Sequence, residues 1–89
     1  MEIKHEPGRF FAKTQHGTAE LLYSQVDAKT LSFYHTFTPD EDRGKGIAEE
    51  LATAAFEYAK EKGFKVRPDC PYIPHFLEKH SEWKQYEAS

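Results

Sequence analysis

The sequence predicts an α/β (α+β) fold, in which an antiparallel three-strand meander leads into a strand, helix, strand crossover and a short final helix. Two short segments rich in β-branched and aromatic residues precede residues 30–38, where hydrophobic residues alternate with a period of two, as in a half-buried strand. The period becomes helical from residue 46 to residue 62, and alternation returns at residues 64–70. We expect residues 1–89 to form a single domain, because a chain of this length builds only one small core.

Three segments predict the meander. RFFAKT (9–14) and TAELLYSQV (18–26) are rich in β-branched and aromatic residues and flank a Gln-His-Gly turn, which together predict a β-hairpin. TLSFYHTFT (30–38) alternates most clearly and predicts the third strand. One face of that strand is expected to carry Leu31, Phe33, His35 and Phe37, and the other Ser32, Tyr34, Thr36 and Thr38.

The segment from Gly46 to Lys62 predicts an amphipathic helix. Its apolar positions fill an arc of about 160° when residues are placed about 100° apart, and acids and lysines occupy much of the rest. Gly63 stands where a helix commonly ends in a left-handed glycine, and lysines in the last turn suit the helix dipole. The apolar arc consists of Ile47, Ala48, Leu51, Ala52, Ala54, Ala55, Tyr58 and Ala59.

Residues after the helix predict a strand, a helix and a tail. FKVRPDC (64–70) alternates, and the helical crossover makes this strand parallel to residues 30–38. PYIPHFLEKH (71–80) is expected to form a second, short helix. SEWKQYEAS (81–89) is expected to form a tail anchored by Trp83 and Tyr86.

Composition narrows the possible partners. The formal net charge is −3, and lysine and arginine do not cluster beyond Arg43 and Lys45, which argues against nucleic-acid binding and favours an amine-bearing partner. No window approaches the roughly 18 apolar residues of a membrane span. Cys70 is the only cysteine and the first ten residues lack the apolar core of a signal peptide, so we expect a cytoplasmic protein. We also expect a monomer or weak dimer without a membrane partner.

Two glycines and two cations separate the predicted third strand from the long helix. Glycine loops ahead of a helix bind anions through backbone N–H groups, and the alternative is that Gly44 and Gly46 only form the turn. The nucleoside triphosphate loop is excluded because no serine or threonine follows Lys45, and the dinucleotide fingerprint lacks a glycine at Glu49. The preceding acids are explained locally, since Thr38-Pro39-Asp40-Glu41 predicts a capping box and one helical turn.

Arg43-Gly44-Lys45-Gly46-Ile47-Ala48 resembles the Arg/Gln-x-x-Gly-x-Gly/Ala loop of the GNAT-type N-acetyltransferases. His35-Thr36 at a strand end and Cys70-Pro71-Tyr72 after the next strand extend the resemblance, over about residues 18–86, to the shortest members of that family. It implies a minimal GNAT-like fold and acetyl-coenzyme A as cofactor, with the pyrophosphate on the loop amides and the pantetheine arm between two splayed parallel strands. The implied cofactor-binding residues are Phe37, Thr38, Arg43, Gly44, Lys45, Gly46, Ile47 and Ala48.

Cys70, His35 and Tyr72 are the catalytic candidates. Cys70 precedes Pro71, a favourable first helical residue, so we predict Cys70 at the N-cap, where the helix dipole would activate it, unless the helix begins only at Pro74. It either carries the acetyl group or is a small buried hydrophobe. His35 is either a core residue or a base, and Tyr72 either packs or, as the resemblance implies, protonates the departing thiolate.

The predicted function is that of an acetyl-coenzyme A-dependent N-acetyltransferase whose acceptor is an exposed lysine, a polyamine or another small amine. One alternative is a coenzyme A-binding or protein-interaction module with little catalysis. Another is a hydrolase using Cys70 with His35 or His75, although no nucleophile-elbow motif is present. No metal site is predicted, because side chains five residues apart on a helix, as at 70, 75 and 80, lie about 140° apart.

Overall fold

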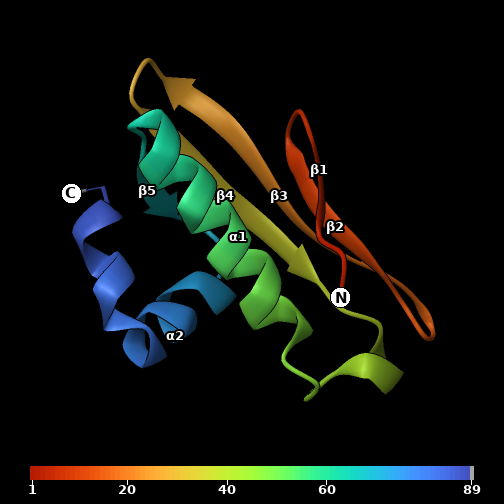
Figure 1. Ribbon diagram of the computed structural model, residues 1–89. Coiled ribbons are helices and arrows are strands. Elements are labelled where there is room, and N and C mark those ends of the chain that lie inside the picture. Colours follow the sequence, from red (N-terminus) through yellow and green to blue (C-terminus); the bar gives the residue numbers. More distant parts are fainter. Residues whose placement is uncertain (89) are drawn as a thin grey trace.

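A computed structural model describes residues 1–88 as one mixed sheet with its helices gathered on one face (Figure 1). The strand order is β1-β2-β3-β4-β5, with antiparallel pairing from β1 to β4 and parallel pairing between β4 and β5. The predicted fold class, meander and parallel crossover are therefore confirmed. The strands are β1 (Lys4–Glu6), β2 (Arg9–Thr14), β3 (Gly17–Asp27), β4 (Thr30–Phe37) and β5 (Lys65–Pro68).

Strand β1 is an addition that the sequence did not indicate. Its three residues are all exposed, so they show no alternation of apolar and polar side chains from which a strand could be predicted. The strand is formed by pairing with β2, where His5 lies opposite Phe10 and stacks on its ring with centroids 4.1 Å apart. Aromatic packing therefore holds an edge strand whose own sequence is polar.

The helical elements are η1 (Asp40–Asp42), α1 (Ile47–Lys62), α2 (Tyr72–Lys79) and η2 (Ser81–Tyr86), of which η1 and η2 are 3₁₀ helices. Helix α1 starts and ends at left-handed glycines, Gly46 and Gly63, both with a φ of 80°, so the predicted end at Gly63 is confirmed. No helix in residues 1–88 is long and apolar enough to cross a membrane.

The core lies between the sheet and α1, and α2 and η2 close it on one side. Phe33 of β4 meets Phe56 of α1 with ring centroids 5.2 Å apart, and Phe56 in turn stacks on Phe76 of α2 at 5.7 Å. Phe56 lay outside the predicted apolar arc, yet it is fully buried because α2 and η2 cover that flank of α1. The predicted anchoring of the tail is confirmed, since Trp83 and Tyr86 pack against the core. Ser89 lies outside the described residues.

A β-bulge at Tyr34 changes which side chains of β4 face the core. Tyr23 pairs with Phe33 and the adjacent Leu22 pairs with His35, so Tyr34 has no partner in β3. Cross-strand partners share a face, so His35 lies with Leu22 on the outer face, opposite the buried Phe33. The predicted placement of His35 and Phe37 on the core face is therefore wrong, and both are exposed.

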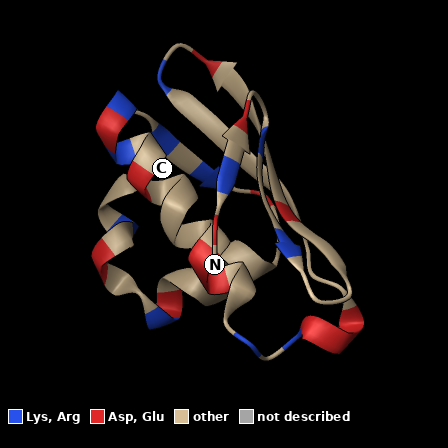
Figure 2. Ribbon diagram, turned by 45° about the vertical axis from the view of Figure 1, so that its right-hand side comes forward, with Lys and Arg blue, Asp and Glu red and all other residues tan. Residues whose placement is uncertain are grey.

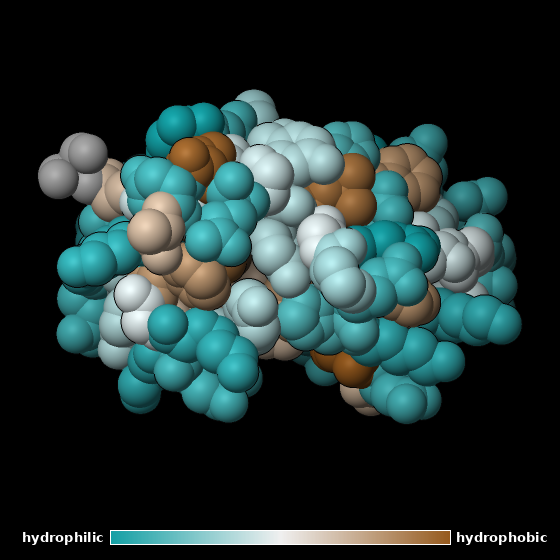
Figure 3. All heavy atoms as spheres, turned by 90° about the horizontal axis from the view of Figure 1, so that it is seen from above, coloured by the Kyte–Doolittle hydropathy of each residue, from teal (hydrophilic) through white to brown (hydrophobic). Residues whose placement is uncertain are grey.

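The parallel strands part near the middle of β4. Their last pair joins Phe33 to Pro68, and β4 continues to Phe37 beyond it. The far edge of β5 is closed by the tail, where the backbone N–H of Ala88 donates to the carbonyl of Val66 at 2.7 Å. Seen from above, hydrophobic residues reach the surface in separate patches among hydrophilic ones (Figure 3).

Candidate functional site

The candidate site is an open pocket of about 510 Å³ beyond the carboxyl end of β4. Ligands of open α/β sheets commonly bind at this end of the strands. One wall is formed by the end of β4, the loop after η1 and the first turn of α1, and the other is formed by α2 (Figure 1). The lining residues are Thr36, Phe37, Thr38, Asp42, Arg43, Gly44, Gly46, Ile47, Ala48, Glu49, Tyr72, His75 and Lys79.

The loop wall presents unpaired backbone donors. Gly44 and Gly46 have φ values of 83° and 80°, in the left-handed region that glycine adopts without strain. The N–H groups from Gly44 to Glu49 have no hydrogen-bond acceptor within residues 1–88, and the first bond of the helix runs from the N–H of Glu50 to the carbonyl of Gly46. A Cβ added to either glycine would meet no atom of another part of the chain within 4 Å, so the loop has room for an anion against its backbone.

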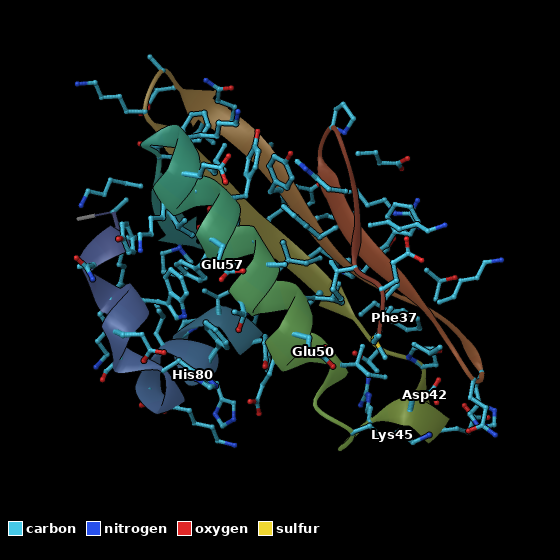
Figure 4. The ribbon with its side chains drawn as sticks, viewed as in Figure 1. Phe37, Asp42, Lys45, Glu50, Glu57 and His80 are labelled. Atoms are coloured by element: carbon cyan, nitrogen blue, oxygen red, sulfur yellow. The ribbon has the colours of Figure 1, made fainter. Side chains whose placement is uncertain are left out.

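Acidic residues of η1 neutralise the cations of the loop, as the adjoining red and blue segments of Figure 2 show. Arg43 lies 3.4 Å from the carboxylate of Asp40 in an exposed pair. The Lys45 ammonium donates to Oδ1 of Asp42 at 3.1 Å, and these two side chains lie close together in Figure 4. Lys45 is the one predicted cofactor-binding residue that does not line the pocket. Two of the three acids of η1 are therefore paired with cations of the loop.

Asp42 ties the loop to the β2–β3 turn. Its side chain is 1% exposed, and Oδ2 accepts a hydrogen bond from the backbone N–H of His16 at 3.1 Å. The pKa of Asp42 is lowered by the nearby Thr14 hydroxyl, the Lys45 ammonium and the His16 amide. Their effect on the pKa is larger than the opposing effect of burial, although the Thr14 hydroxyl makes no hydrogen bond of regular geometry. Asp42 is therefore an anion at neutral pH. Sequence reasoning missed it because its partner is remote in the chain.

The turn before the loop differs in one respect from its prediction. A helical turn does form at Asp40–Asp42, as expected, but it is a 3₁₀ helix without a side-chain cap. The predicted capping box led by Thr38 is therefore wrong. Pro39 takes the cap position and packs against the β2–β3 turn, where a Cβ added to Gly17 would lie 3.2 Å from Pro39 Cγ. This close approach also fastens the hairpin to the loop.

Cys70 sits where β4 and β5 part. Its backbone N–H donates to the carbonyl of Phe33 at 3.0 Å, and its sulfur lies 3.3 Å from the Thr36 hydroxyl. Cys70 is 6% exposed and is not among the pocket-lining residues. Helix α2 begins at Tyr72 with Pro71 in the cap position, so the predicted N-cap role of Cys70 is wrong. The bulge turns Thr36, not His35, toward the thiol.

Tyr72 lines the pocket from the first turn of α2. Burial raises the pKa of its phenol to about 12, and the negative charge of Glu49 adds to the shift. The phenol is therefore protonated throughout the neutral range. In that range the phenol can donate a hydrogen bond but cannot act as a base.

Helix α2 contributes two further lining residues that the cofactor prediction lacked, His75 and Lys79. Glu49 of α1 also lines the pocket, and its carboxylate lies 3.1 Å from Nε2 of His80 at the end of α2. Residues 72, 75 and 79 share one face of a helix, a spacing that could have indicated them. Within residues 1–88, no group of three metal-binding side chains converges.

The sequence model of GCN5-related N-acetyl-transferases matches residues 9–86. The chain belongs to this family. Among relatives of this GNAT chain, Protein NATD1 of Xenopus tropicalis is 40% identical over 65 residues, which cover 73% of the chain and 60% of that protein. The human Protein NATD1 is 37% identical over 65 residues, covering 73% and 58%. The match thus spans about 60% of the length of these curated relatives.

A solved structure agrees with the family assignment. The solution structure of a GCN5-like protein from Staphylococcus aureus superposes with a TM-score of 0.81 at 29% sequence identity. The superposition covers 99% of this chain and 88% of that one. The resemblance to small GNAT proteins inferred from the sequence is therefore confirmed, and so is the GNAT-like fold. The roles of individual site residues stay predictions.

Proposed function

We propose that this GNAT protein binds acetyl-coenzyme A in the pocket and transfers the acetyl group to an amine. The observation that carries the proposal is the row of unpaired N–H groups from Gly44 to Glu49 at the start of α1. A pyrophosphate suits such a row, because the donors and the helix dipole both favour negative charge. Seven of the eight predicted cofactor residues line the pocket, and only Lys45 does not.

The free part of β4 supports a site for the pantetheine arm. After the Phe33–Pro68 pair, β4 continues to Phe37 without a partner from β5, and its end reaches the pocket at Thr36 and Phe37. An extended ligand that carries amide groups can pair with an open strand edge as an added strand would. The arm would thus bring the thioester toward Thr36, Cys70 and Tyr72.

The residues around that point suit acyl transfer. Acetyl-coenzyme A supplies an acyl group activated by its thioester. The amine nitrogen bonds to the acyl carbon, the carbon–sulfur bond breaks, and the sulfur receives a proton while the amine loses one. Tyr72 is the candidate donor for the sulfur, because its phenol lines the pocket, stays protonated and can hydrogen-bond the sulfur as it leaves. Its raised pKa of about 12 makes it a weak acid, so its position and not its pKa supports this role.

Direct transfer to the amine is favoured over a cysteine relay. Cys70 is almost fully buried, its sulfur contacts the Thr36 hydroxyl, and it forms no hydrogen bond to an imidazole within residues 1–88. His35 lies on the other face of the sheet. His35 remains a candidate base for an acceptor that approaches from that outer face. No helix formed by residues 1–88 covers the outer face (Figure 1), which leaves room for an exposed lysine or a polyamine.

The test is release of free thiol from acetyl-coenzyme A in the presence of a polyamine or a lysine-bearing peptide. We expect acceptor-dependent release by the parent protein and none by Gly46→Glu, whose carboxylate would face the pyrophosphate. Release no faster than in buffer, with any amine tested, would contradict the transferase proposal.

The relay is tested separately by intact-mass measurement after incubation with acetyl-coenzyme A alone. Direct transfer predicts no acetyl adduct on Cys70, and it predicts that Cys70→Ala retains acetyl transfer. An adduct in the parent that is absent in Cys70→Ser would support the relay instead.

A further inference from the structure

The wall formed by α2 carries a stripe of polar side chains along the pocket. Tyr72, His75 and Lys79 stand at positions i, i+3 and i+7, which fall within about 60° of one another around a helix. Lys79 lies about 10 Å further along the helix axis than Tyr72, at 1.5 Å per residue. The stripe therefore runs from the predicted thioester end of the pocket, at Tyr72, toward its outer end.

Lys79 differs from the cations of the opposite wall. Arg43 and Lys45 are each paired with a carboxylate of η1. Lys79 forms no ion pair and no side-chain hydrogen bond within residues 1–88, although it lines the pocket and is exposed. His75 is likewise exposed toward the pocket, and a histidine ring offers an N–H donor in either tautomer.

One acid that lines the pocket, Glu49, already has a hydrogen-bond partner on the α2 side. Glu49 lines the pocket between the two walls, and its carboxylate lies 3.1 Å from Nε2 of His80. His80 is held in turn by stacking on Phe76 with ring centroids 4.5 Å apart. The Glu49 carboxylate therefore contacts the ring of His80 at the end of α2, and stacking on Phe76 holds that ring in place. Of the two cations that line the pocket, Arg43 is therefore paired with a carboxylate, whereas Lys79 forms no ion pair within residues 1–88.

We propose that His75 and Lys79 form a second anion site, which binds the 3′-phosphate on the ribose of coenzyme A. The inference rests on the proposed function. In the proposed function the loop amides bind the pyrophosphate. Coenzyme A carries one more phosphate, the 3′-phosphate at its nucleotide end. A lysine binds phosphate as a point charge, and the histidine adds a directed donor one turn away. The pair makes the site selective for coenzyme A over ligands without that phosphate.

The experiment compares the dissociation constants of coenzyme A and dephospho-coenzyme A, which lacks only the 3′-phosphate, by calorimetry. The parent protein is expected to bind coenzyme A about tenfold more tightly, the size of a charge-assisted hydrogen bond. In Lys79→Ala the preference falls to about twofold or less while affinity for dephospho-coenzyme A is unchanged, and Lys79→Arg retains it. Lys84→Ala, an exposed lysine outside the pocket, is the matched control and keeps the full preference.

The outcomes separate this inference from the function on which it rests. Equal affinity of the parent for both ligands would overturn the second anion site and leave cofactor binding intact. A preference that survives in Lys79→Ala, or an equal loss of affinity for both ligands, would also overturn it. Failure of the parent to bind either ligand at millimolar concentration would overturn both proposals.

Discussion

The glycine loop, residues 43–48, and the corner where β4 and β5 part are the two halves of the proposed site. The loop contributes main-chain groups, whereas the corner contributes side chains. The loop presents backbone N–H groups, and its shape depends on two left-handed glycines. The corner depends on which way Thr36, Cys70 and Tyr72 point. A backbone site is specified by residues that permit a conformation, whereas a side-chain site also requires the correct face of each strand and helix.

The bulge at Tyr34 illustrates the difference. The residue types of β4 alternate without interruption through Phe37, so the sequence places His35 on the face of Phe33. One unpaired residue reverses the alternation and puts Thr36 beside Cys70 instead. No comparable slip can disturb the loop, because its donors belong to the main chain.

The largest expected effect comes from Gly46→Glu, with Gly63→Glu as its matched control. Both glycines have a φ of 80° and open space at the Cβ position, so each substitution carries a similar strain of about 1–2 kcal/mol. Only Gly46 lines the pocket, and we expect at least a roughly hundredfold loss of coenzyme A affinity there, from a carboxylate placed against phosphate. Thermal unfolding and calorimetry of both variants separate strain from binding. Equal affinity loss in the two variants would contradict the loop site.

A smaller effect on acetyl transfer is expected at the corner from Tyr72→Phe. This substitution removes the phenol hydroxyl, the candidate proton donor, and keeps the aromatic ring that lines the pocket. The rate constant kcat should fall about a hundredfold while the dissociation constant of acetyl-coenzyme A stays unchanged. A thioester of a more acidic thiol needs less help from a donor, so the loss should shrink with such a substrate. Tyr86→Phe, whose tyrosine packs beside Trp83 away from the pocket, should behave like the parent. A defect that does not depend on the leaving thiol would exclude proton donation.

The smallest expected effect concerns the ion pair between Asp42 and Lys45, which holds the loop. Asp42→Asn removes the charge that pairs with Lys45, and we expect coenzyme A affinity to fall about fivefold. The pKa of Asp42 is lowered by its neighbours Thr14, Lys45 and His16. The ionised carboxylate therefore stabilises the folded state at a pH above the ordinary carboxyl pKa of about 3.9. This contribution to the free energy of unfolding is lost as the pH falls through that pKa and below it.

Denaturant unfolding of the parent and of Asp42→Asn between about pH 6 and 3 measures that contribution. The stability difference between the two proteins should narrow as the pH falls. The pKa of Asp69 is also lowered, by Ser32 and Arg67, but that residue is common to both proteins and cancels. A difference that is constant with pH would show that Asp42 acts through packing alone.

Much of the fold was predictable because its determinants are local. The hairpin turn, the helix ending at Gly63 and the parallel crossover follow from turn residues and periodicity in short segments. The departures depend on distant packing. Strand β1 exists through its contact with Phe10, and Phe56 is buried through α2 and η2. Asp42 meets His16 across 26 positions of the chain, a contact that local periodicity cannot reveal.

The proposed function requires that the backbone from Gly44 to Glu49 binds the pyrophosphate of acetyl-coenzyme A. The most direct measurement is a titration of isotope-labelled protein with this ligand, followed through the backbone amide resonances. Saturable shifts centred on the loop, with smaller ones at Phe37 and Thr38 and none at Gly63, are the predicted result. The absence of shifts at the loop with millimolar ligand would contradict the account.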